Sequence, residues 1–371
     1  MKRGLATLFI LIISAFPSLH AQNGVPYAVP GRPLAHRAAI DSAALLVERL
    51  MQKSGAPGAS VTVLLGGKTV WSRGFGLADV EQQVPATTLT RFRIGSVSKP
   101  LTAAALGLLV DEGKLDLDAP VQRYVPDFPV KRWPMTVCQV AGHLSGIRHY
   151  RDGEFGSQRH FNSVAEALTV FKDDTLLFEP GSKFSYSSYA WNLLSAVVEG
   201  ASGESFLAYM QRRVFGPLGM LHTVADHPDS IIPFRSRFYT RSDSAGGVLN
   251  AAYVDNSIKW AGGGFLSTTE DLARFGQAML DGSLLTSGTR AMLWRTQRTK
   301  DGKETGNGVG WFVSTDSTGR TAVSHTGGAM GGTAYLLLYP REQIVVATLL
   351  NSDRSIINAR KVGEFFLRGA R

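Results

Sequence analysis

The sequence predicts an α+β fold: an antiparallel sheet flanked by N- and C-terminal helices, with an all-helical region inserted in the middle. Alternating β-type segments occur near the beginning and the end of the 371 residues, and amphipathic segments lie outside both groups. Between them, residues 115 to about 235 show helical spacing only. We therefore expect an α/β lobe of about 34–114 and 236–371, a helical lobe of about 115–235, and a ligand site between the two.

The N-terminal part predicts a helix, a hairpin and a second helix. Apolar residues recur with helical spacing over 34–54, and this helix is expected to end near Gly55. Two alternating runs follow, ASVTVLLGG and KTVWSRGFGLAD, which predict a hairpin that turns at Gly66 and Gly67. A nearly unbroken apolar run then extends to about Glu112, which indicates a buried helix.

The middle of the chain predicts helices, and the last third predicts the remaining strands. Helical segments are expected around 136–144, 163–172, 187–201 and 204–215. Strand patterns return at 237–242, 310–315, 320–325, 333–340 and 343–351. A final helix is expected over 356–367.

Residues 1–21 have the pattern of a secretory signal peptide. Lys2 and Arg3 give a positive start, and the apolar stretch 5–16 is too short to span a bilayer comfortably. We expect cleavage after Ala21, a periplasmic or secreted protein, and no stable membrane insertion afterwards. An uncleaved N-terminal anchor is the alternative.

Charge, histidine spacing and cysteine content exclude other classes. The net charge is +9, but the 39 Lys and Arg residues are scattered without a long run, so we expect no nucleic-acid partner. The eight histidines show no HExxH-type spacing, and we expect neither a metal nor a cofactor. Cys138 is the single cysteine, so no intrachain disulfide forms.

The stretch SVSK places Ser96 and Lys99 three residues apart at the start of the apolar helix. On a helix this spacing brings the two Cβ atoms to about 5–6 Å. A lysine enclosed there loses hydration, which favours its neutral form and lets it accept the serine proton. The alternative is a helix start with a solvated lysine. Pro100 disfavours helical geometry at Lys99, so the helix is expected to start just before Ser96 or immediately after it.

Two other segments carry residue types that such chemistry needs. Tyr186 lies between a glycine turn and a predicted helix in PGSKFSYSSYAW. The run RTAVSHTGGAMGG predicts a strand that leads into His325, Thr326, Gly327 and Gly328. A glycine-rich edge strand lets a substrate approach its backbone and offers N–H donors.

Together these segments resemble the serine β-lactamase and penicillin-binding-protein superfamily, in its branch of class C β-lactamases, D-aminopeptidases and esterases. Ser96 to Lys99 matches its S-x-x-K motif, residues 186–188 match Tyr-x-Asn, and residues 325–327 match Lys/His-Thr-Gly. The stretches KLDLDAPVQRYVPDFP, HLSGIRHY, YVDNSIKWAGGGFLST and SHTGGAMGG are similar to the mitochondrial serine β-lactamase-like group.

The resemblance implies a β-lactamase/transpeptidase-like serine hydrolase domain over 34–371. Ser96 would be the nucleophile, with Lys99 and Tyr186 sharing the roles of general base and proton relay. The N–H groups of Ser96 and Gly328 would form the oxyanion hole. The substrate-binding residues implied by the motifs are Ser188, His325, Thr326, Gly327 and Gly328.

Two departures from the motifs bear on the substrate. Ser188 stands where asparagine is usual, and its hydroxyl is shorter than a planar amide that both donates and accepts. His325 stands where class C β-lactamases have lysine, and histidine is only partly charged at neutral pH. Both argue against an efficient β-lactamase and for a peptidase or esterase.

For other residues of the matched stretches, roles outside the chemistry itself are expected or remain open. His143 and Ser145 are expected to hold a loop, and residues 260–264 to form a backbone wall. Residues 148–150 either contact substrate or lie on the surface.

The leading hypothesis is an exported serine hydrolase that cleaves peptide or amide bonds through a Ser96 acyl-enzyme. Its substrate would be a peptide, a D-amino-acid peptide or an ester. A class C-like β-lactamase, a D-Ala-D-Ala carboxypeptidase and a carboxylesterase are the rivals within this chemistry. A non-catalytic scaffold or sensor that binds peptide or cell-wall fragments is the rival from another class. The natural substrate and the oligomeric state stay open.

Overall fold

The computed structural model describes residues 36–241, 247–353 and 355–368. The expected signal peptide at 1–21 lies outside the described residues. No helix within the described ranges is both long enough and apolar enough to cross a membrane.

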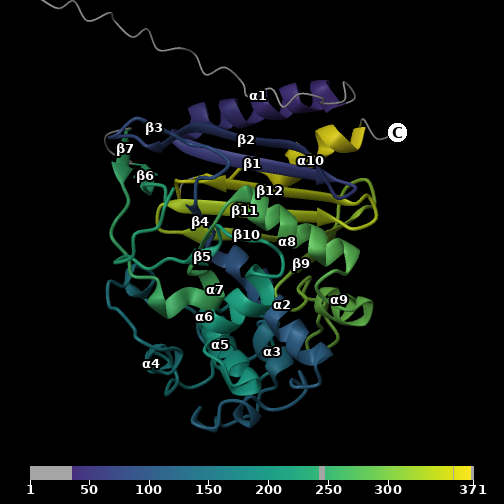
Figure 1. Cartoon of the computed structure of the whole chain (residues 1–371). Helices are drawn as coiled ribbons and strands as arrows, with labels where there is room; N and C mark the ends of the chain where they lie inside the picture. Colours follow the sequence, from purple (N-terminus) through teal and green to yellow (C-terminus); the bar gives the residue numbers. More distant parts are fainter. Residues whose placement is uncertain (1–35, 242–246, 354, 369–371) are drawn as a thin grey trace, which may run out of the picture. The chain divides into compact units, whose positions relative to one another are not determined.

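A seven-stranded antiparallel sheet forms the centre of the fold (Figure 1). Its strands, in spatial order, are β3 Val84–Pro85, β2 Lys68–Asp79, β1 Gly58–Leu65, β12 Ile344–Leu350, β11 Gly332–Tyr339, β10 Thr321–Ala329 and β9 Phe312–Thr315. Every neighbouring pair is antiparallel. The predicted antiparallel sheet is therefore confirmed, and β1 from the N-terminal part pairs with β12 from the C-terminal part.

Helices cover both faces of this sheet, which explains why β11 and β12 are buried along their whole length. Helices α1 (Arg37–Ser54) and α10 (Ala359–Arg368) pack on one face and α8 (Thr269–Asp281) on the other (Figure 1). Successive side chains of a strand point to opposite faces. On β11, Tyr335, Leu337 and Tyr339 accordingly join the core with α1 and α10, whereas alternate residues join the larger core with α8.

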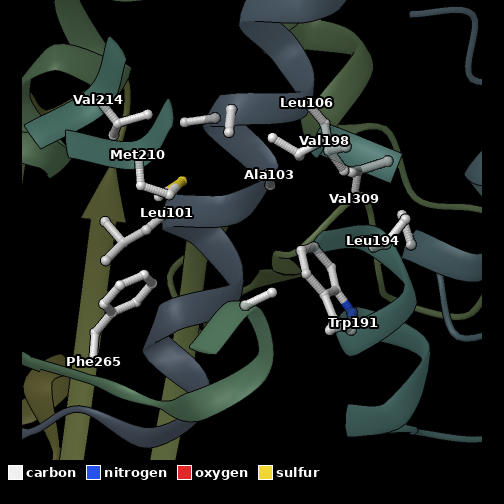
Figure 2. Packing of buried hydrophobic residues seen from close by; sticks show 14 of the residues in the cluster. Leu101, Ala103, Leu106, Trp191, Leu194, Val198, Met210, Val214, Phe265 and Val309 are labelled. Carbon is white, nitrogen blue, oxygen red and sulfur yellow. The ribbon is translucent and has the colours of Figure 1, made fainter. Parts of the chain in front are cut away.

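The larger core surrounds α2 (Ser98–Asp111), the predicted buried helix. Every residue from Ser98 to Leu109 is buried. Leu101, Ala103 and Leu106 pack among side chains from α5 and from the π-helical turn that follows α6 (Figure 2). A helix that is apolar on all sides needs such a surround, and its burial fixes where its first turn emerges.

Four of the remaining helices coincide with predicted segments: α3 Val137–Ala141, α4 Val164–Leu168, α5 Ser188–Ser202 and α6 Phe206–Tyr209. Helices α7 Trp260–Gly263 and α9 Ser287–Trp294, like α8, were not predicted from the sequence. The segment predicted as one helix over 204–215 is instead α6 followed by a π-helical turn, Met210–Phe215.

Two small sheets differ from the prediction. A three-stranded sheet joins β4 (Phe92–Arg93), β8 (Phe265–Ser267) and β5 (Val224–Ala225), so one short strand lies in the region predicted to be all-helical. The segment 237–242 contains β6 (Tyr239–Arg241), but this strand pairs with β7 (Val248–Asn250) and not with the main sheet. Strands of two or three residues are too short to show a period in the sequence.

Candidate active site

Ser96 and Lys99 lie on either side of a change in helix type. Ser96 belongs to a 3₁₀ turn, Gly95–Val97, and α2 begins directly after it at Ser98. Of the two starting points that the sequence allows, the helix thus starts immediately after Ser96. Pro100 is the third residue of α2, where the first backbone N–H groups have no partner inside the helix, so its missing N–H costs no helical hydrogen bond.

The Lys99 amine is fully buried and is held by three oxygen atoms. Its Nζ lies 3.0 Å from Ser96 Oγ, 3.3 Å from Ser188 Oγ and 2.5 Å from the carbonyl oxygen of Gly262. Lys99 is 0% exposed, and burial lowers its pKa well below 10.5. None of its hydrogen-bond partners is a carboxylate, so no opposite charge offsets the lost hydration, and the neutral form of the amine beside the serine hydroxyl is favoured.

Tyr186 reaches the same hydroxyl from the start of α5. Ser187 caps this helix, because its Oγ accepts the N–H of Ala190. Burial raises the pKa of Tyr186, and a hydrogen bond from Ser96 acts in the opposite direction. Lys99 Nζ lies 5.0 Å from the centre of the Tyr186 ring. The S-x-x-K serine is therefore in contact with both predicted partners.

The glycines of β10 bring this strand against the turn that carries Ser96. A Cβ placed on Gly327 would lie 2.0 Å from the carbonyl oxygen of Ile94 and 3.1 Å from the backbone nitrogen of Ser96. A Cβ on Gly328 would meet nothing within 4 Å. The backbone of β10 thus lies against the Ser96 turn at both glycines, because a Cβ on Gly95 would also lie 2.5 Å from the carbonyl oxygen of Gly328, and only the side-chain direction of Gly328 is open. An oxyanion hole between Ser96 and Gly328 would need this close approach.

The same strand has a free edge beyond its middle. β9 pairs with β10 only from Thr321 to Ser324, so residues 325–329 have no ladder partner on that side among the described strands. Thr326 and Gly328 are exposed, and Gly327 is buried. This edge is open for pairing with an extended chain.

His325 does not extend from this edge into solvent. Its side chain is buried against Phe312, with ring centres 4.6 Å apart, and its Nδ1 donates to the carbonyl of Thr326 at 2.6 Å. Burial, and then the nearby Lys99, lowers the pKa of His325 to about 3. A neutral ring stands where a class C lactamase would have a cation.

Ser188 also faces inward. It is the first residue of α5 and is only 4% exposed, with its hydroxyl directed to Lys99. Ser188 therefore exposes little surface to a substrate, although a substrate contact is its predicted role. Its hydroxyl contacts the Lys99 amine instead.

His143, His149 and the carbonyl of Gly262 make contacts at the site that the sequence did not predict. His143 stacks on Tyr186 with ring centres 4.3 Å apart, and its Nδ1 accepts the N–H of Ser187, so it holds the loop and also supports the tyrosine. His149 lies edge-on to Tyr186 at 5.8 Å. The stretches HLSGIRHY and WAGG were the available signals, but a contact such as the Gly262 carbonyl has no side-chain signature.

Within the described ranges, no group of three His, Cys, Asp or Glu residues is arranged to hold a metal ion. The histidines near Tyr186 instead make hydrogen bonds to backbone groups.

Comparisons with known proteins identify the family of the chain. Residues 43–362 match the profile of the family described as Beta-lactamase. The serine beta-lactamase-like protein LACTB, mitochondrial, of Homo sapiens is 36% identical over 399 residues, which cover 82% of this chain and 72% of that protein.

Solved structures share the fold. The octameric penicillin-binding protein homologue from Pyrococcus abyssi matches with a TM-score of 0.75 and 25% identity, covering 88% of this chain and 76% of that one. D-amino acid amidase from Ochrobactrum anthropi SV3 matches with a TM-score of 0.76 and 22% identity, covering 91% and 98%. The superfamily that the three motifs predict is thus confirmed, and the chain belongs to the Beta-lactamase family of serine β-lactamases and penicillin-binding proteins.

Proposed function

We propose that this protein is a serine hydrolase that cleaves peptide or amide bonds through an acyl-enzyme on Ser96. One observation carries the proposal: the buried amine of Lys99, without a carboxylate among its hydrogen-bond partners, lies 3.0 Å from the Ser96 hydroxyl oxygen. A solvated lysine would keep its proton at neutral pH and could not act as a base. Family membership supports hydrolysis, and the geometry supports these residues in its steps.

In the first step, Lys99 takes the Ser96 proton while Ser96 Oγ forms a bond to the substrate carbonyl carbon. The N–H groups of Ser96 and Gly328 stabilise the oxyanion that develops. The C–N bond then breaks, and the proton returns from Lys99 through Tyr186 to the leaving amine. Burial raises the pKa of Tyr186, so it remains a phenol, which suits a relay and leaves the base role to Lys99.

The second step reverses the proton transfers. Lys99 takes a proton from water, the hydroxide oxygen attacks the ester carbon, and the tetrahedral intermediate collapses. The C–Oγ bond breaks, Ser96 regains its proton, and the acid product leaves. One water is consumed for each amide bond cleaved.

The free edge of β10 supports an extended peptide as substrate, because its backbone could pair with residues 325–329. The neutral, buried His325 argues against substrates that need a fixed cation for a carboxylate, which include β-lactams and peptides ending in D-Ala. D-amino-acid amides, peptides and esters are therefore the first substrates to test.

Export is part of the proposal and rests on the leader-like residues 1–21. Cell fractionation with N-terminal sequencing tests it. A mature protein that begins at Gln22 in the periplasm or medium agrees, and an intact N-terminus in the cytosol contradicts it.

The test of the chemistry is covalent labelling. The purified protein is incubated with a fluorophosphonate or with a fluorescent penicillin, and the intact mass is read. We expect one fluorophosphonate adduct, absent from Ser96→Ala and present in Ser98→Ala, because Ser98 Oγ donates to the carbonyl of Gly95 and is not free to react. Equal labelling of Ser96→Ala, or no adduct on the parent protein, would refute the proposal. Rapid turnover of the penicillin would favour the β-lactamase alternative.

A further inference from the structure

A row of aromatic side chains from the helical lobe leads away from the Ser96–Lys99 pair. It begins at Tyr186, whose ring centre lies 5.0 Å from Lys99 Nζ. His149 lies edge-on to Tyr186 with ring centres 5.8 Å apart, and the Tyr150 ring follows at 4.5 Å from His149. Phe155 ends the row, with its ring centre 5.7 Å from that of Tyr150. These four residues are called the aromatic wall below.

The aromatic wall approaches β10 at both of its ends. At its beginning, the ring of Tyr186 lies 6.3 Å from that of His325. At its other end, a Cβ placed on Gly156 would lie 3.6 Å from Cε of Met330, the residue that directly follows β10, which is ordinary van der Waals contact. Gly328, between these points, is exposed. The space between β10 and the wall is therefore open at Gly328 and closed by contact at Met330.

Loop 153–157, which makes this contact, is anchored to the segment directly before α7. The Nζ of Lys259 donates to the carbonyl of Phe155 at 2.5 Å, and the backbone N–H of Asp255 donates to the carbonyl of Ser157 at 3.0 Å. Backbone groups that are paired in this way hold a loop in one place. The loop is therefore a fixed barrier at the Met330 end of β10.

Strand β9 bounds the other end of the free edge. Its last pair with β10 joins Phe312 to Ser324, so a substrate strand can pair only from residue 325 onward. The slot between β9 and the barrier thus comprises residues 325–329. At about 3.4 Å per residue, it is about 17 Å long.

The proposed oxyanion hole divides this slot unevenly. Gly328 lies two positions before Met330, which leaves about 7 Å between an attacked carbonyl and the barrier. Because an extended chain spans about 3.3–3.6 Å per residue, this short side holds about two substrate residues. Its end is apolar: Phe155 is 39% exposed, and Met330 is partly exposed. On the other side of Gly328, residues 325–327 offer about 10 Å.

We propose that loop 153–157 and Met330 make the enzyme exo-acting: it cleaves within about two residues of one end of a chain, and an apolar terminal residue packs on Phe155 and Met330. This inference rests on the proposed function and names its substrate class, which is short peptides and peptide amides with an apolar end. Specificity here comes from a barrier that rejects longer chains and not from a charged contact.

The test uses two matched series of peptide amides that start from Phe-Phe, prepared from D- and from L-residues. One series adds alanines at the amino end and the other at the carboxyl end, so that each arm grows from one to three residues. Mass spectrometry reads which bond is cleaved, and kcat/KM is measured for the central bond. We expect kcat/KM to fall about 100-fold at the third residue in one series only, because a residue that does not fit displaces the carbonyl from its oxyanion donors.

Two variants open the barrier by different routes. Met330→Ala removes the side chain that meets Gly156, and Phe155→Ala removes an exposed ring and keeps the test available where the first variant fails to fold. Each should restore the rate on the three-residue arm relative to the one-residue arm. Met292→Ala is the matched control, because Met292 is also partly buried but lies on α9, and it should keep the parent dependence on length. Thermal unfolding of every variant detects misfolding.

The outcomes separate this inference from the one on which it rests. Fluorophosphonate labelling of Ser96→Ala at the parent rate overturns both. Labelling that depends on Ser96, together with the same dependence on length in both series or with no cleavage of any peptide, overturns the exo-acting inference alone. A length limit that persists in Met330→Ala and in Phe155→Ala overturns the assignment of the barrier to these residues.

Discussion

The contact of β10 with the Ser96 turn makes Gly327→Ala a sharp perturbation. The new Cβ would lie 2.0 Å from the carbonyl oxygen of Ile94, whereas ordinary contact begins near 3.4 Å, so the strand or the turn has to move by about 1.4 Å. Both neighbours are backbone and cannot turn aside. A displacement of about 1 Å at reacting groups can cost about 100-fold in rate. Overpacking of this kind costs about 1–3 kcal/mol of unfolding free energy.

The neighbouring Gly328→Ala is the matched control, because its Cβ would meet nothing within 4 Å. Both variants are compared by urea unfolding and by the rate of fluorophosphonate labelling. We expect Gly327→Ala to lose stability and to label roughly 100-fold more slowly, and Gly328→Ala to keep the parent stability. If Gly327→Ala unfolds and labels like the parent protein, the close approach of β10 to Ser96 and the oxyanion hole built on it are refuted.

Three further results follow from buried charges. The labelling rate should rise with pH through the lowered pKa of Lys99, without a step near pH 6.5 from His325, because burial and then the charge of Lys99 lower the pKa of His325 to about 3; a step near 6.5 from this histidine would contradict this. Burial lowers the pKa of Lys259 from 10.5 to about 8, so the native state binds fewer protons than the unfolded state in that window, and stability rises with pH there. The free energy of unfolding of Lys259→Met relative to the parent protein, measured in urea, should therefore fall by about 3 kcal/mol from pH 8 to 10.5. A difference that does not change with pH would refute a charged Lys259 amine below pH 8. We expect Arg148→Met to lower the free energy of unfolding by about 2–3 kcal/mol, measured by thermal unfolding. This cost is smaller than for a fully buried ion pair, because the carboxylates of Glu154 and Asp174 are about a quarter exposed. An unchanged stability would show that these ion pairs do not hold the loop around Arg148.

The long elements of the fold were predictable because their periodicity is long enough to read. The hairpin of β1 and β2 turns at Gly66 and Gly67, both with positive φ, as the sequence indicates. The helix predicted over 34–54 is α1, Arg37–Ser54, and it ends where Gly55 adopts the left-handed conformation. The short strands β4, β5 and β8 were missed because each is shorter than two periods of alternation, and they form only through tertiary packing.

The site was predictable as far as its side chains carry motifs. The structure brings Ser96, Lys99 and Tyr186 into contact, although the tyrosine lies far along the chain. The inward orientation of Ser188 and the burial of His325 could not be read from their residue types, because both depend on neighbours from other segments. The roles of the nucleophile and its base remain predictions that the labelling experiments test.

The amine of Lys99 has a consequence for how the protein matures. Its contacts join segments 89 and 163 residues apart along the chain, at Ser188 and Gly262. In an unfinished or partly unfolded chain, Lys99 is hydrated and keeps its proton, so Ser96, the proposed nucleophile, lacks a base. On that proposal, reactivity toward an acylating probe appears only when the distant segments have closed around the amine, and labelling of Ser96 reports complete folding.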